Sequence, residues 1–195
     1  SSDLFIDVQW GHFHPFANTS DGFSYNGFAS KITPGVKYTF YDRPNKRASV
    51  DLQMDFKQGA TNSNNDKLER ESIRDIRAGV QYDQQWEKTT LSVRNEIAAA
   101  FDILGARASF APFQPLANAG SQFVRTTGFA VLERTLPMDS TLTLNTSWQY
   151  SPDTLPMYDQ FCGGGTFAGR GYREVFICGD SGALASVQWQ APAFF

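Results

Sequence analysis

The segment SVDLQMDFK, at residues 49–57, decides the fold class. Its apolar residues Val50, Leu52, Met54 and Phe56 alternate with polar or charged ones. A period of two puts successive side chains on opposite faces of a β-strand, so the segment predicts a strand with one apolar and one polar face. The same alternation recurs at residues 4–10, 36–40, 75–82, 141–150 and 185–189.

The connections between the expected strands alternate in length. Two further strands, at residues 89–101 and 122–134, alternate less cleanly, which brings the expected total to about eight strands with no convincing helix. Short turns are expected at residues 42–47, 83–88 and 136–139, and long loops at residues 14–31, 59–71, 105–120 and 151–182. Short periplasmic turns that alternate with long external loops are typical of outer-membrane barrels.

Aromatic residues near the strand ends favour the same fold, because barrels carry aromatic girdles at both membrane interfaces. The residues concerned are Trp10, Phe13, Tyr41, Trp86, Phe101, Trp148 and Tyr150. The sequence therefore predicts an all-β fold, an antiparallel transmembrane β-barrel, with residues 1–195 as a single barrel segment in contact with the lipid bilayer. Alternation alone does not say which face meets which medium, so a soluble secreted β-sandwich stays open as an alternative.

The composition limits the class of partner and chemistry. A net charge of -3, from 17 Lys+Arg and 20 Asp+Glu, is too weak to indicate a nucleic-acid partner. A mean hydropathy of -0.37 would normally indicate a soluble protein, but barrel strands are apolar only at alternate positions. The H-x-H at His12 and His14 could form half a metal site, but an interfacial or loop role is favoured, because aromatic residues and a proline surround it. No segment has the arrangement of a nucleophilic triad, so we expect no metal, no cofactor and no enzymatic activity.

Charged residues on the polar faces of the expected strands form a second pattern. We place them on the lumen side of the barrel, where their mixed signs suit a hydrated interior that an unfolded chain crosses without binding tightly. An ordinary polar sheet face is the alternative interpretation. The residues are Lys37, Asp51, Asp55, Lys57, Asp75, Arg77, Arg94 and Glu96.

The most informative motif lies in the longest expected loop. Residues 160–182 read QFCGGGTFAGRGYREVFICGDSG, and GAL and an amphipathic strand follow. This arrangement resembles the outer-membrane transporters of two-partner secretion, the TpsB proteins, which share a superfamily with the barrel-assembly proteins. In that family a long external loop folds back into the lumen, and its tip carries a V-R-G-[YF] motif. Arg170, Gly171 and Tyr172 correspond to the motif, and Gly169 stands where the family usually has Val.

The resemblance implies a fold and a function. Such transporters have a 16-stranded barrel preceded by POTRA domains, so this chain would hold roughly strands five to twelve, with residues 151–182 as the lumen loop and the POTRA domains and other strands absent. The implied function is export of a partner exoprotein, of adhesin or haemolysin type, across a Gram-negative outer membrane. Two alternatives stay open: a barrel-assembly insertase of the same superfamily, and a small passive outer-membrane barrel.

The motif and its flanking cysteines are the candidate site residues. An arginine at a glycine-flanked tip, such as Arg170, can bind a lumen carboxylate through two parallel hydrogen bonds. Such a contact would act either as a conformational latch or as a stabilising strut. Cys162 and Cys178 lie 16 residues apart on either side of the motif, and an even, small cysteine count in an exported protein favours a disulfide.

Overall fold

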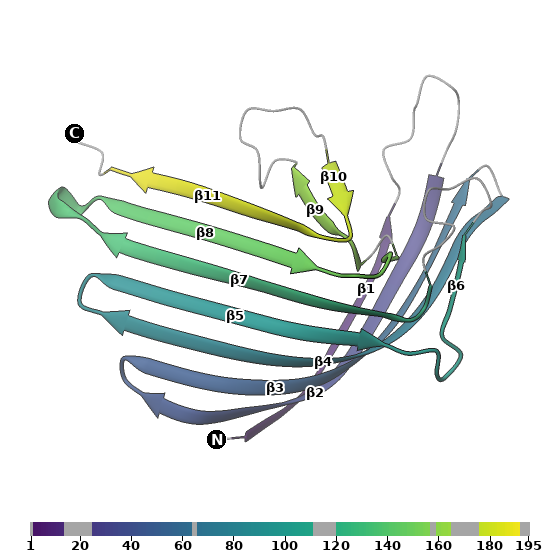
Figure 1. Cartoon of the computed structure of the whole chain (residues 1–195), viewed down its shortest axis with the longest axis horizontal. Helices are drawn as coiled ribbons and strands as arrows, with labels where there is room; N and C mark the ends of the chain where they lie inside the picture. Colours follow the sequence, from purple (N-terminus) through teal and green to yellow (C-terminus); the bar gives the residue numbers. More distant parts are fainter. Residues whose placement is uncertain are drawn as a thin grey trace.

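The described residues form one curved antiparallel sheet. The computed structural model describes residues 2–13, 25–63, 66–110, 120–156, 159–164 and 176–191. Eight long strands lie side by side in the order β1-β2-β3-β4-β5-β7-β8-β11 (Figure 1). Their bounds are β1 Ser2–Phe13, β2 Tyr25–Arg43, β3 Lys46–Ser63, β4 Asp66–Trp86, β5 Thr89–Ala100, β7 Phe123–Thr135, β8 Thr141–Tyr150 and β11 Gly182–Gln190.

Three short strands complete the sheet structure. β6, Arg107–Phe110, pairs with β4 beyond the end of β5. β9, Phe161–Gly164, and β10, Phe176–Gly179, form a separate two-stranded hairpin. One 3-10 turn, η1 at Pro137–Asp139, connects β7 to β8. The described part of the chain contains no helix of the length and hydropathy that a membrane span requires.

The eight expected strands and the three short turns are confirmed, but some expected loops are wrong. Residues 59–71 were expected to form a loop, whereas β3 continues to Ser63 and β4 begins at Asp66, with Gly59 paired to Glu71. Residues 25–31, also expected in a loop, belong to β2. The reason is physical: these strand ends lack the apolar alternation in sequence, but their backbone ladder continues because backbone hydrogen bonds do not depend on which side chains are apolar.

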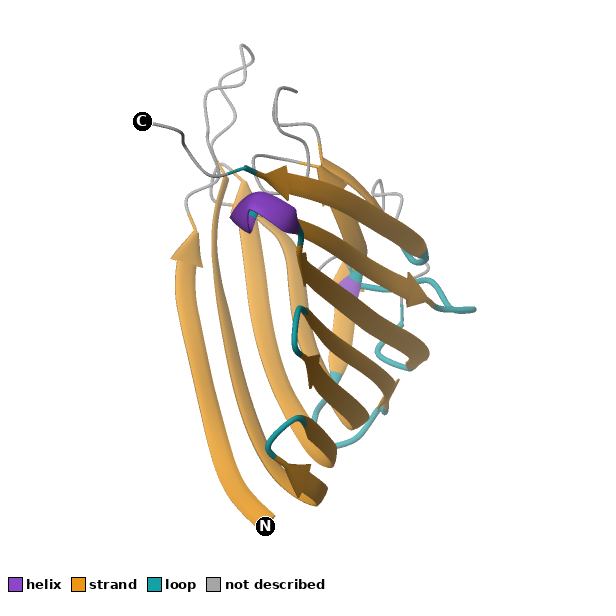
Figure 2. Ribbon diagram, turned by 90° about the vertical axis from the view of Figure 1, so that its left-hand side faces the viewer, coloured by secondary structure: helices purple, strands orange, loops and turns teal. Residues whose placement is uncertain are grey.

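The apolar side chains of the long strands lie on the convex face and remain exposed. Leu4 is 86% exposed and Ile6 69%, and Leu52 is 53% exposed in the middle of the sheet. Leu52 pairs with Val36 on one side and Ala78 on the other, so the apolar row continues from strand to strand. In a soluble sandwich this face would be covered. Instead the sheet curls as a single layer (Figure 2), which rejects the β-sandwich alternative.

The polar side chains lie on the concave face and are largely buried. Asp55 and Asp75 are both 0% exposed, and Asp51 is 6% exposed. A small apolar cluster, formed by Ile73, Ala100, Phe123 and Leu155, covers the loop end of the same face. The faces are thus inverted relative to a soluble protein, with apolar groups outside and charges inside. This is the arrangement that a membrane-spanning barrel wall requires.

Aromatic side chains lie near both ends of the strands. Tyr41 and Trp86 are partly exposed at the turn end, at 36% and 46%, and Phe101 and Tyr150 at the loop end, at 42% and 61%. These positions agree with the expected interfacial girdles, while the side chains of Trp10 and Phe13 lie outside the described residues. Trp148 instead packs across Gly128, its partner on β7, where any larger residue would clash with the indole ring.

Candidate functional site

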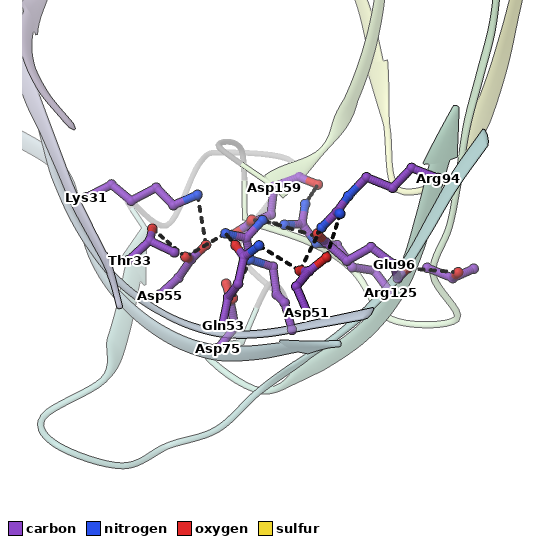
Figure 3. A network of polar contacts seen from close by, with 12 residues as sticks. Lys31, Thr33, Asp51, Gln53, Asp55, Asp75, Arg94, Glu96, Arg125 and Asp159 are labelled. Atoms are coloured by element: carbon purple, nitrogen blue, oxygen red, sulfur yellow. Dashed lines mark hydrogen bonds and ion pairs between the residues drawn. The ribbon is translucent and has the colours of Figure 1, made fainter. Parts of the chain in front are cut away.

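Ten charged side chains form one connected network on the concave face (Figure 3). They come from five neighbouring strands, β2, β3, β4, β5 and β7, and from the segment that follows β8. The alternation of each strand places them on the same face, because every second side chain of a β-strand points to one side of the sheet. The cations are Lys31, Lys57, Arg77, Arg94 and Arg125, and the anions are Asp51, Asp55, Asp75, Glu96 and Asp159.

Asp55 is at the centre of the network. Its carboxylate lies 2.7 Å from Arg77 Nη2 and 2.9 Å from Lys31 Nζ, and it accepts a hydrogen bond of 2.7 Å from the Thr33 hydroxyl. A carboxylate with no exposed surface is costly unless cations and donors compensate it. Three strands, β2, β3 and β4, supply these groups, so the site forms only when the sheet is in register.

Arg77 and Arg94 connect the rest of the network. Arg77 lies 3.2 Å from Glu96, and Arg94 lies 3.0 Å from the other oxygen of the same carboxylate. Arg94 also binds Asp51 through two hydrogen bonds, of 2.6 and 2.9 Å, the bidentate geometry that a guanidinium favours. Gly79 lies beneath this pair, and a Cβ there would lie 2.6 Å from Arg94 Nη2. The glycine therefore makes room for the ion pair.

Asp159 brings the segment after β8 into the network. Its Oδ1 lies 2.5 Å from Lys57 Nζ and 3.0 Å from Arg125 Nη2. Its backbone carbonyl accepts hydrogen bonds from Arg125 at 3.0 Å and from Gln149 at 2.9 Å. The residue is 1% exposed. A loop residue is thus held on the concave wall by side chains of β3, β7 and β8.

The network is electrically balanced, with five cations and five anions. Paired charges of both signs on strands that neighbour one another make the wall rigid and give it a small net field. Within the part of the chain that the structure describes, no group of His, Cys, Asp or Glu side chains is arranged to hold a metal ion. The arrangement is that of a polar wall.

All eight charges expected on the lumen side lie on the concave face. Seven belong to the network, and Lys37 lies 3.4 Å from the Gln81 side chain. Lys31, Arg125 and Asp159 were missed. Lys31 and Lys37 are both at odd-numbered positions of β2, so the alternation that predicted the direction of Lys37 could also have predicted that of Lys31. Arg125 lies in a strand whose apolar alternation is weak. Asp159 lies outside the long strands, where no periodicity signals its direction.

The motif residues Gly169, Arg170, Gly171 and Tyr172 lie outside the described residues. The two cysteines are described. Cys162 on β9 and Cys178 on β10 face each other in register and are joined as a disulfide, with their Cα atoms 4.1 Å apart. Phe161, next to Cys162, packs on Gly182 at the start of β11, so the hairpin is fastened to the main sheet.

A curved antiparallel sheet with an apolar convex face and an ion-paired concave face defines the wall of a transmembrane β-barrel. A model of the family "Haemolysin secretion/activation protein ShlB/FhaC/HecB" matches residues 11–191. The chain therefore belongs to this family, which is a family of outer-membrane protein transporters. No curated protein matches the chain at a significant level.

Two solved structures share the fold. CdiB from Escherichia coli superposes with a TM-score of 0.83 at 12% identity, covering 96% of this chain and 35% of that chain. CdiB from Acinetobacter baumannii superposes with a TM-score of 0.74 at 18% identity, covering 98% of this chain and 35% of that chain. The chain thus spans about a third of the length of either structure. At these identities the likeness concerns the fold.

Proposed function

We propose that this chain is part of an outer-membrane pore that exports a secreted partner protein in extended form by two-partner secretion. The family match over residues 11–191 carries the proposal. The inverted faces support it, since an exposed apolar convex face requires lipid and a charged concave face requires water. In the whole protein, further strands of the same barrel and periplasmic POTRA domains would complete the pore.

We propose further that residues 151–182 fold into the lumen and that Arg170 acts there as a latch. Two groups of the segment, Leu155 at 0% and Asp159 at 1% exposure, already lie against the concave wall and support this placement. A bridge between Cys162 and Cys178 would close the base of the motif segment and limit the positions that its tip can reach.

The test is export of the cognate exoprotein by the full-length protein in the bacterium that encodes it. Deletion of the transporter should abolish export of that one protein and leave the levels of other outer-membrane proteins unchanged. A general loss of outer-membrane proteins would indicate an insertase instead. Export that continues without the transporter would leave a passive barrel as the remaining function.

Arg170→Ala tests the latch, with Arg173→Ala as the matched control from the same motif segment. Removing one partner of a buried ion pair costs about 3–5 kcal/mol. We therefore expect Arg170→Ala to reduce export at least about tenfold, since about 1.4 kcal/mol corresponds to a factor of ten, whereas Arg173→Ala retains it. Unchanged export and unchanged pore conductance in Arg170→Ala would remove this residue from the mechanism. Replacing Cys162 and Cys178 together by Ser should lower export less, because the motif itself remains.

A further inference from the structure

Asp159 connects two strands that are not neighbours in the sheet. Lys57 lies on β3 and Arg125 on β7, and β4 and β5 lie between them. The Asp159 carboxylate meets both cations with one oxygen atom, Oδ1. The Asp159 side chain therefore links the segment between β8 and β9 to both strands, in addition to the hydrogen bonds to its backbone carbonyl and the packing of Leu155.

The other charged residues of the network carry one excess positive charge, which the Asp159 carboxylate neutralises. Without Asp159 the network has five cations and four anions, a difference of one positive charge. Lys57 retains Asp75 as a partner at 2.7 Å. Among the described residues, Arg125 has no carboxylate partner other than Asp159. The surplus positive charge thus belongs to β7, and the loop residue neutralises it.

The ion pair between Asp159 and Arg125 also leaves two buried polar atoms without a hydrogen bond among the described residues. Asp159 Oδ2 and Arg125 Nε are buried, and neither has a hydrogen-bond partner within the described structure. A buried ion pair repays its desolvation cost only when its remaining donors and acceptors are also bound. Buried Asp55, Asp75 and Arg77 atoms share this feature. What is particular to Asp159 is that its carboxylate is bound through Oδ1 alone, so release of the segment has to break only the ion pairs of that one atom and the hydrogen bonds to the Asp159 backbone carbonyl.

We propose that Asp159 is a releasable electrostatic anchor, which keeps the segment between β8 and β9 on the lumen wall and leaves Lys57 and Arg125 when that segment clears the path of an exported chain. The inference rests on the proposed transport function. Asp159 is a positioning residue, distinct from the motif at residues 169–172. When the anchor is released, one uncompensated positive charge faces the lumen, so the open pore should prefer anions.

The test is single-channel recording of the full-length protein in planar bilayers, without any exported protein. Asp159→Asn should raise the mean conductance at least about twofold and shift the reversal potential in a KCl gradient toward anion selectivity. Asp153→Asn is the matched control, because Asp153 lies in the same segment but accepts a hydrogen bond from the Val124 backbone outside the network. It should behave as the wild type.

The double variant Asp159→Asn with Arg125→Gln separates anchoring from charge. It should keep the raised conductance and lose the anion shift, because the cation in excess is gone. Asp159→Glu should restore the wild-type conductance. An Asp159→Asn pore that matches Asp153→Asn would overturn the anchor, and an anion shift that persists in the double variant would overturn the charge assignment.

Heat-modifiable mobility on denaturing gels verifies that each variant folds. If Asp159→Asn does not fold, Arg125→Gln alone provides the test: Lys57 still holds Asp159, so a smaller rise in conductance is expected, now with a shift toward cations. No change in this variant would also overturn the anchor. Because these recordings require no exported protein, their failure would leave the proposed export function intact, and a failure of export would leave these recordings valid.

Discussion

The concave face has two halves that differ in how they keep polar groups inside a membrane protein. The charged half, on β2 to β5, carries Lys31, Asp51, Asp55, Lys57, Asp75, Arg77, Arg94 and Glu96. The neutral half, on β8 and β11, presents mostly hydroxyl and amide groups at the equivalent alternate positions, with Leu184 opposite Ser147. The residues with these polar groups are Thr143, Asn145, Ser147, Ser186 and Gln188. Strand β7 joins the two halves.

The difference shows where the wall is held together. Carboxylates of the charged half are nearly inaccessible, with Asp55 and Asp75 at 0% exposure, and partners from neighbouring strands surround them. In the neutral half, Thr143, Asn145 and Ser147 of β8, an interior strand of the sheet, are half-exposed. A hydroxyl or amide group can face water without a protein partner, whereas a buried charge needs one. We therefore expect the charged half to set stability and the neutral half to tolerate change.

Arg77→Met should have the largest effect, because it breaks the charged half at its centre. The substitution removes the Asp55 partner at 2.7 Å and the Glu96 partner at 3.2 Å. Asp55 keeps Lys31 and Glu96 keeps Arg94, but the buried network is left with one anion in excess. We expect the free energy of unfolding to fall by about 3–5 kcal/mol. Guanidinium unfolding of the full-length protein in detergent, followed by tryptophan fluorescence, measures it.

Gln188→Met is the matched control on the neutral half, since it gives the same side chain at a position of β11 where no charge is removed. Its effect should stay within about 0.5 kcal/mol. Equal losses in the two variants would show that the halves contribute alike to stability, and the comparison would then fail.

Gly79→Ala should have an intermediate effect. The new methyl group would lie 2.6 Å from Arg94 Nη2 and 2.8 Å from Asp51 Oδ1, so one or both must move. Overpacking of this kind costs about 1–3 kcal/mol. The same unfolding measurement tests it, with Ser147→Ala on the neutral half as the control expected to change little. Wild-type stability in Gly79→Ala would mean that the Arg94 and Asp51 side chains can shift away from the new methyl group without loss of stability, and that their ion pair is not rigid.

The sequence predicts most of the fold because the period of two is present in the residues themselves. Val50, Leu52, Met54 and Phe56 identify one face of β3, and Asp51 and Asp55 then belong to the other. The medium on each side is not fixed by that pattern. The exposed fractions of the side chains show that the apolar face is the outer, convex one.

The candidate site was less predictable for a related reason. Which carboxylate meets which cation depends on the register of strands that are far apart in sequence, such as Asp51 with Arg94, 43 residues apart. Asp159 lies between strands, 102 residues after Lys57, and no local pattern indicates its direction. The extended hairpin at residues 59–71 was missed because backbone pairing alone, without an apolar face, leaves no periodic signal in the sequence.

Asn145→Asp should have the smallest effect on stability and tests whether the neutral half faces open water. Asn145 is half-exposed and pairs with Ser186 on β11, so its side chain lies among other uncharged groups. If water fills the space beside it, the new carboxylate stays hydrated, and the unfolding free energy should change by less than about 0.5 kcal/mol.

The pore should nevertheless become more cation-selective, because nothing on that half compensates the charge. Planar-bilayer recordings at low salt should show this shift, and salt at about 1 M, where the Debye length is about 3 Å, should suppress it. A loss of stability comparable to that of Arg77→Met would instead mean that the neutral half is covered and that its lack of charge is a structural requirement.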